Sequence, residues 1–459
     1  MFMFCKVYED YDCMLNQTNI GHNNNKYYVI QIIREGKSYH TWTRWGRVGE
    51  SGQNKDSVFS SPDAAIKEFE KKFKDKTKNN WSDRENFVFS SMIVIHSRHF
   101  FLCFSQVVQD RVDGKAKNVL PCTLDKSTQN LIELIFNTDM FKEAMEEMNL
   151  DIKKMPLGKL SKMQITKGFD VLEELEAALN QKNKKAKLEE LSSKFFTIIP
   201  HNFGRQRPPT IDTKEIIEKK KEMLMVLADI ELAQTLKTET EKAQEEIKTV
   251  PHPADQNYTS LMCKLTLLDK KSEIYKIIEK YLAETRHSHC PPKIKNVWEV
   301  DRDTEGDRFQ ENDHLENRRL LWHGTNIAVV AAILKSVGRG IYFASENAKS
   351  AGYVGTSKNT GIMFLNEVAL GKEKNITADD SSLKKAPNGF DSVVARGRVE
   401  PDPSKDVFIT LDGKQVAVPQ GPAIDQPQYK DSHFCNSEYL VYKESQCRIR
   451  YLLELHMRY

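Results

Sequence analysis

The residues that could perform chemistry gather in three short segments of the second half of the chain. The first, LLWHGT (320–325), places a histidine, a glycine and a threonine at the end of an apolar run. A strand leading into a turn would set His323 at a pocket edge. Gly324 and Thr325 would follow it there, and the glycine would let a ligand approach main-chain groups closely. A lone histidine is more often structural, so this segment by itself predicts no reaction.

The second segment, GRGIYFASENAKSAGYVG (338–355), contains two tyrosines and a serine. We expect a short strand that presents Tyr342, followed by a helix over 346–353 in which Ser350 and Tyr353 share one face. The two tyrosine rings could form the walls of a slot for a flat ring, while the Ser350 hydroxyl bonds an amide. Ordinary aromatic packing is the competing interpretation.

The third segment is the strand-like run EYLVY (438–442), which opens on Glu438. This carboxylate is either exposed at the start of a strand or aimed into a cleft. For an isolated glutamate the exposed position is the more common one.

Metal-binding patterns are weak in this sequence. The eight cysteines are scattered without a CxxC pair, which is typical of reduced thiols in an intracellular protein. RHSHC (286–290) has ligand-type side chains but lies in a Pro-flanked polar loop without a second cluster. We therefore expect no metal site.

Several domains must position these segments, because 459 residues exceed what one core usually holds. Residues 26–34 and 39–49 are β-rich, and Ser61 and Pro62 then begin a helix. Apolar residues recur on one face of this helix, at Ile66, Phe69 and Phe73. Lysines occupy the opposite face, at Lys67, Lys71, Lys74 and Lys78.

The rest of the chain is first helical and then rich in strands. Residues 124–248 read as helices, two further helices are expected at 257–285, and strands at 362–370, 438–442 and 448–456. We predict a multidomain α+β protein. Its parts would be a small α/β domain, an atypical segment or linker, an all-α helical bundle and a C-terminal α+β domain, bounded at 1–84, 85–118, 119–250 and 251–459.

Composition excludes several classes of protein. With 39% hydrophobic and 29% charged residues, the chain is neither disordered nor of the membrane type. A formal net charge of +3 is too small to prove a nucleic-acid partner. The apolar stretch 87–104 carries His96, Arg98 and His99 at its centre, so a strand pair or linker is expected there rather than a membrane span. The first residues have no basic region followed by an apolar one, so we expect no secretory signal.

Taken together, HGT, GIYFAS with SAGY, and SEYLVY resemble the ADP-ribosyltransferase domain of the poly(ADP-ribose) polymerase family, with its histidine, tyrosine and glutamate triad. FLNEVALGK, GFDSVVARGRVEPDP and ESQCRIRYLLEL resemble a mainly mono-ADP-ribosylating member of the DNA-dependent branch. LEELSSKFFTIIPHNFG and VLADIELAQ resemble the autoinhibitory regulatory domain of that branch, and RWGRVGE resembles its WGR domain. The similarity covers most of the chain.

The resemblance implies that NAD is a consumed substrate, that no cofactor is retained, and that ADP-ribose passes to an acceptor through an oxocarbenium-like transition state. His323 would position the ribose, and Glu438 would stabilise the charge that develops at the anomeric carbon. Main-chain groups at Gly324 and the Ser350 hydroxyl would bind the nicotinamide amide. The ring would lie between two tyrosines, Tyr342 and Tyr353.

The resemblance also implies partners and a location. Trp45 would stack at a DNA strand break and Arg47 would grip a phosphate. DNA binding would then relieve inhibition by the helical domain. The acceptors would be proteins, including the chain itself, and the location would be the nucleus.

Two departures from the family pattern leave an alternative open. The family carries an arginine-bearing loop between the helix after HGT and the GIYF strand, but here AAILKS (331–336) runs through Val337 directly into Gly338 and Arg339. Residues 85–117 also do not resemble the family. The alternative is a scaffold that binds DNA breaks while its transferase pocket is impaired.

Overall fold

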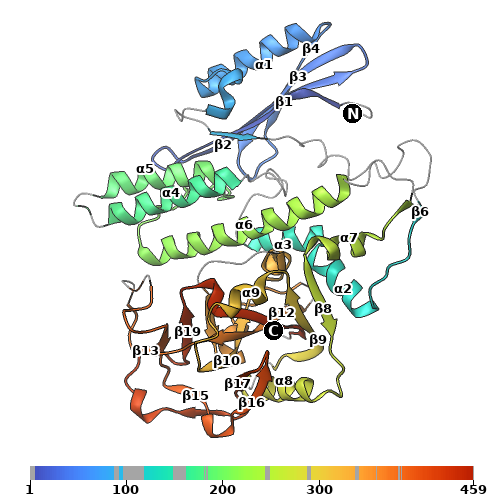
Figure 1. Cartoon of the computed structure of the whole chain (residues 1–459). Coiled ribbons are helices and arrows are strands. Elements are labelled where there is room, and N and C mark those ends of the chain that lie inside the picture. Colours follow the sequence, from blue (N-terminus) through green and yellow to red (C-terminus); the bar gives the residue numbers. More distant parts are fainter. Residues whose placement is uncertain are drawn as a thin grey trace. The chain divides into compact units, whose positions relative to one another are not determined.

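The computed structural model describes residues 6–86, 93–96, 118–147, 162–179, 181, 184–242, 249–286, 291–335, 341–357, 359–380, 383 and 385–457. The described residues group into two compact units (Figure 1). One lies within 1–116 and 141–235, and the other within 117–140 and 236–459. No helix in the described ranges is long and apolar enough to cross a membrane.

The first unit begins with an antiparallel sheet in the order β4-β3-β2-β1-β5, of which β1 to β4 are labelled in Figure 1. Its strands are β1 (Lys6–Asn19), β2 (Asn24–Glu35), β3 (Ser38–Arg47), β4 (Gln53–Phe59) and β5 (Ile93–His96). The two expected β-rich runs are confirmed as β2 and β3. β5 is the part of the apolar stretch 87–104 that the structure describes, and it pairs with β1.

Helix α1 (Pro62–Thr77) packs on this sheet as its sequence pattern predicts. Ser61 Oγ accepts from the Ala64 backbone N–H, and the Phe69 and Phe73 side chains are fully buried beside Trp81. Burying each of these aromatic rings stabilises the fold by about 2 to 3 kcal/mol. The lysines of the opposite face are exposed, at Lys67, Lys71, Lys74 and Lys78.

Helices follow the sheet. They are α3 (Thr138–Glu147), α4 (Lys162–Leu179), α5 (Lys185–Ile198) and α6 (Lys214–Lys242). Helix α5 bonds to β1 through buried groups. Asn16 Nδ2 donates to the carbonyls of Phe196 and Thr197 over 3.2 and 3.0 Å, and the Thr18 N–H donates to Thr197 Oγ1 over 2.8 Å. The sheet and α5 therefore share one polar seam.

The second unit is built on one large sheet, whose main path has the order β13-β14-β19-β11-β10-β12-β20-β9-β8. Its strands are β8 (Cys263–Leu267), β9 (Lys293–Arg302), β10 (Arg318–Gly324), β11 (Ile341–Ala344), β12 (Thr360–Ala369), β13 (Glu373–Ile376), β14 (Ser392–Ala395), β19 (Glu438–Val441) and β20 (Cys447–His456). The expected strands at 362–370, 438–442 and 448–456 are confirmed. A side branch of β16 (Val407–Leu411) and β17 (Lys414–Val418) joins β10, and β15 (Val399–Pro401) pairs separately with β18 (Ala423–Asp425).

The helices of this unit are α2 (Lys126–Ile135), α7 (Pro253–Ser260), α8 (Glu273–Glu284), α9 (Glu305–Gln310), α10 (Val330–Lys335) and α11 (Asn347–Ala351). The expectation of two helices over 257–285 was wrong in part, because β8 lies between α7 and α8. Cys263 and Leu265 are buried while Lys264 and Thr266 are exposed, which is the alternation of a strand.

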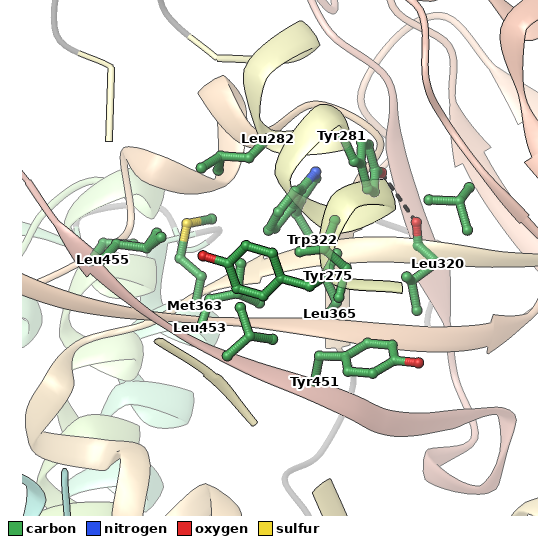
Figure 2. Close-up of a cluster of buried hydrophobic side chains, with 14 of the residues drawn as sticks. Tyr275, Tyr281, Leu282, Leu320, Trp322, Met363, Leu365, Tyr451, Leu453 and Leu455 are labelled. Carbon is green, nitrogen blue, oxygen red and sulfur yellow. Dashed lines mark hydrogen bonds between the residues drawn. The ribbon is translucent and has the colours of Figure 1, made fainter. Parts of the chain in front are cut away.

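Helix α8 covers one face of the large sheet, and its buried side chains meet those of the strands (Figure 2). Tyr281 packs against Trp322 with ring centroids 4.8 Å apart. Its hydroxyl lies 3.1 Å from the Leu320 carbonyl and 3.0 Å from the Ser345 carbonyl. One buried tyrosine therefore ties β10 to the segment that follows β11.

Candidate functional site

The three chemistry-bearing segments lie on neighbouring strands. Trp322 of β10 pairs with Ala344 of β11, and Ala344 pairs with Glu438 of β19. His323 follows Trp322 directly, and Tyr342 lies two residues before Ala344 in the same short strand. The sheet therefore brings the His323, Tyr342 and Glu438 positions together, although the chain separates them widely.

The histidine segment ends where β10 meets α11. The His323 ring lies 6.0 Å from the Phe343 ring, edge to face, and the histidine is half-buried. A Cβ built on Gly324 would lie 1.9 Å from the Ser350 carbonyl oxygen, so only glycine allows α11 to approach β10 this closely. Gly324 and Ser350 are thus in direct contact, and Thr325 beside them is 9% exposed.

Helix α11 is shorter than the predicted helix over 346–353, with Glu346 as its N-cap residue and Gly352 as its C-cap. Ser350 is buried and its hydroxyl donates to the Trp322 carbonyl over 3.2 Å. Tyr353 lies beyond the helix end with 64% of its surface exposed, while the side chain of Tyr342 lies outside the described residues. Of the two tyrosines expected to form the slot, the structure therefore describes the side chain of Tyr353 alone, and that ring is exposed.

Glu438 has a cationic partner. Lys349 Nζ lies 2.7 Å from Glu438 Oε1, and the two side chains are 30% and 23% exposed. Burial disfavours the charged amine, but the hydrogen bond and negative charge of Glu438 outweigh it and raise the pKa of Lys349. The pair holds the Glu438 carboxylate in one place beside a cation.

A buried network fixes the backbone around Glu438. Ser437 Oγ donates to Glu400 Oε2 over 3.0 Å and accepts from the Gly397 N–H over 2.9 Å. The hydroxyl of Tyr439 donates to Glu400 Oε1. Burial, followed by the charge of Glu400, raises the pKa of Tyr439. The residues on both sides of Glu438 are therefore held by the protein interior.

The two candidate DNA-contacting residues lie at the end of β3. The Trp45 ring stacks on the Tyr28 ring, with 5.8 Å between the ring centroids. Lys76 Nζ lies 4.8 Å from the centroid of the Tyr28 ring. The Arg47 guanidinium donates to the Asn23 carbonyl over 2.9 Å, to the Gln206 carbonyl over 2.8 Å and to the Gly204 carbonyl. Arg47 thus links the sheet to the loop between α5 and α6.

Sequence reasoning missed Lys349 and the loop partners of Arg47. Lys349 lies within the segment 338–355, but its partner Glu438 belongs to a distant strand, and only the sheet register brings the two together. Nothing in the pattern around Arg47 indicates a contact with Gly204 or Gln206.

Two sequence expectations concern residues that the structure leaves undescribed in whole or part. Residues 336–340, where the family loop would stand and where Arg339 lies, are outside the described residues, as are 287–290 of RHSHC. Among the residues that are described, no group of three His, Cys, Asp or Glu side chains could hold a metal ion.

Comparison with known families assigns all three parts of the chain. A model of the poly(ADP-ribose) polymerase catalytic domain matches residues 272–457, and a model of the regulatory domain of the same enzymes matches 122–258. A WGR domain model matches 11–88. The predicted fold class, with a WGR domain, a helical regulatory domain and a catalytic domain, is confirmed.

Comparison with individual proteins gives matches over almost the whole length. The chain is 54% identical over 475 residues to the mouse protein mono-ADP-ribosyltransferase PARP3, covering 98% of this chain and 89% of the relative. The chicken protein of the same name is 56% identical over 474 residues, with 98% and 88% covered. Human poly [ADP-ribose] polymerase 2 is 36% identical over 488 residues, with 100% and 81% covered.

Proposed function

Because the chain belongs to the poly(ADP-ribose) polymerase family, and is an ADP-ribosyltransferase that uses NAD as its substrate, we propose that it attaches single ADP-ribose units to proteins in response to DNA strand breaks. The observation that carries the proposal is the row Trp322–Ala344–Glu438, which sets the His323, Tyr342 and Glu438 positions on adjacent strands. The names of the mouse and chicken relatives support transfer of single units.

In the proposed reaction the bond between nicotinamide and ribose breaks, and nicotinamide leaves with the bonding electron pair. The acceptor nucleophile forms the new bond to the anomeric carbon and gives up its proton. Glu438 would bond the 2′-hydroxyl of the ribose, stabilise the positive charge at that carbon and help to remove the acceptor proton. The short distance to Lys349 supports this role, because the ion pair fixes the position of the carboxylate at the strand end.

The remaining site residues would bind and orient NAD. Gly324 and Ser350 would bond the nicotinamide amide, which fits their close approach, and His323 would hold ribose hydroxyls. Tyr353 would stack on the nicotinamide ring from its exposed position, opposite Tyr342.

The N-terminal sheet would sense the break. Trp45 would stack on an exposed base or sugar, and the exposed lysines of α1 would add salt-sensitive contacts to phosphates. A DNA phosphate that binds the Arg47 guanidinium would break its hydrogen bonds to the Gly204 and Gln206 carbonyls. The loop between α5 and α6 would then lose these contacts with the sheet. This supports a path from DNA to the helical domain, and DNA as the partner supports a nuclear location.

The proposal is tested with purified protein and labelled NAD, with and without 5′-phosphorylated nicked DNA, beside Glu438→Gln. We expect labelling of added protein and of the chain itself that rises with nicked DNA and is lost in the variant. Equal labelling with and without DNA would contradict activation by breaks. DNA binding without any labelling would favour the scaffold alternative.

A further inference from the structure

A second side-chain pair joins the two segments that Lys349 and Glu438 join. Asn436 Nδ2 donates to Glu346 Oε1 over 2.8 Å. Glu346 directly precedes α11, and Asn436 lies two residues before Glu438. We propose that this pair is a positioning device for the transferase reaction, because it holds α11 against the start of β19 and so keeps Lys349 and Ser350 in place relative to Glu438. The inference rests on the function proposed above.

The Glu346 carboxylate does not cap the helix that it precedes. Glu346 is the N-cap residue of α11, yet its side chain makes no capping hydrogen bond to the helix. The residue is only 5% exposed, and burying a carboxylate is costly unless hydrogen bonds compensate it. The bond from Asn436 provides such compensation and reaches across to another strand.

The backbone of Asn436 is firmly held, so its side chain can act as a fixed support. A Cβ built on Gly397 would lie 2.6 Å from Asn436 Cα, and the Val399 N–H donates to the Cys435 carbonyl over 2.9 Å. Asn436 also forms a parallel bridge with Val399. The contacts with Gly397 and Val399 therefore hold the Asn436 side chain in a fixed position.

The spacing of the two pairs makes them a clamp. Glu346 and Lys349 are three residues apart at the first turn of α11, while Asn436 and Glu438 are two apart at the start of the strand. Other hydrogen bonds already tie α11 to Trp322 and Thr285. The two side-chain pairs add the contacts that set its orientation and distance relative to the start of β19. Glu346 and Asn436 themselves are not among the residues expected to touch NAD, so their effect would act through Lys349, Ser350 and Glu438.

The test measures nicotinamide release by the full-length protein with nicked DNA in Asn436→Ala, Asn436→Asp, Glu346→Gln and the double variant Glu346→Gln/Asn436→Asp. Asn436→Ala should lower kcat by about 10- to 100-fold with little change in KM for NAD, the effect of a displaced reacting group. Glu346→Gln retains an acceptor oxygen and should keep most of the activity. The double variant reverses donor and acceptor and should restore activity relative to Asn436→Asp alone. Asn388→Ala, at an exposed position, is the matched control.

A second readout does not depend on turnover. Competitive chemical labelling of the Lys349 amine across pH, followed by mass spectrometry, reports its titration in each folded variant. In Asn436→Ala the raised pKa of Lys349 should fall toward that of a free lysine, because Glu438 is less closely held. An unchanged titration overturns the inference whether or not the wild type is active. In an active wild type, an unchanged kcat in Asn436→Ala, or no recovery in the double variant, overturns it as well. A wild type that releases no nicotinamide defeats the proposed function instead.

Discussion

Lys349 of α11 and Glu438 of β19 form an ion pair, with 2.7 Å between Lys349 Nζ and Glu438 Oε1. Both side chains are partly exposed, so solvent screens the pair and its contribution to stability is small. Its importance is geometric, since it places a cation beside the carboxylate that is proposed to face the reacting carbon.

Replacing Lys349 by methionine should lower kcat for nicotinamide release by about 10- to 100-fold, because the Glu438 carboxylate is no longer held in one position. Lys349→Arg keeps the charge and should lose less. The measurement is steady-state turnover with nicked DNA, beside Lys405→Met at an exposed position of the same unit. Wild-type kcat in Lys349→Met would show that Glu438 needs no such support.

Replacing Gly324 by alanine should displace α11 from β10, because the new Cβ would meet the Ser350 carbonyl at 1.9 Å. We expect a loss of about 1 to 3 kcal/mol in the free energy of unfolding and a higher KM for NAD. Gly352→Ala is the matched control, since its built Cβ lies 3.6 Å from the Lys349 carbonyl oxygen, an ordinary contact. The measurements are the free energy of unfolding from denaturation and the KM for NAD of both variants. Equal values in the two variants would count against a tight contact between α11 and β10.

Replacing Arg47 by alanine should weaken binding to nicked DNA and reduce the salt dependence of that binding. The loss of one phosphate contact lowers the slope of log K against log salt by about 0.9. The increase in rate on adding nicked DNA should also be smaller, since DNA can no longer act by drawing the Arg47 guanidinium from the Gly204 and Gln206 carbonyls. Arg34→Ala, at the opposite end of the β2 and β3 pair, is the control. An unaltered salt slope would mean that Arg47 does not contact phosphate.

The stability of the first unit should fall on acidification because of His201. Burial, followed by the charge of Lys220, lowers the pKa of His201 to about 3, whereas the unfolded chain has a pKa near 6.5. The unfolded state therefore binds the extra proton below pH 6.5, and the free energy of unfolding should drop by about 2 kcal/mol between pH 7.5 and 5 from this group.

The check for His201 is urea unfolding of the wild type and of His201→Gln at both pH values. The variant should lose this part of the pH dependence, while His22→Gln, at an exposed position, should keep it. The same pH dependence in His201→Gln and the wild type would refute the assignment. Lys220 Nζ lies 2.8 Å from His201 Nε2, so the variant should also change the titration of that lysine.

The sequence predicted the elements whose signals are local. Helix α1 was identified from its cap at Ser61 and from the spacing of Phe69 and Phe73, and both signals depend on residues within a few turns. β4 was not predicted, because its sequence QNKDSVF is polar and mostly exposed, so it lacks the alternation that marks a strand. β8 was missed because its alternation extends over five residues between two helices.

For the site, the resemblance named the residues, but the contacts between them could not be predicted. Glu438 meets Lys349 and Asn436 meets Glu346 only after β11 and β19 pair in register. No local pattern in the chain encodes such long-range partners. The roles of His323, Tyr342, Ser350, Tyr353 and Thr325 stay predictions until variants are measured.

The register between β11 and β19 also determines which changes evolution can make without moving the site. Ala344 is paired with Glu438 by the strand ladder itself, so the loops that join the helices and strands between β11 and β19 can gain or lose residues while the carboxylate stays where it is. An insertion of one residue within β19 would instead turn every later side chain to the other face of the sheet. Differences in length among such enzymes should therefore accumulate in the loops between β11 and β19, while the four residues of β19 allow no change in length.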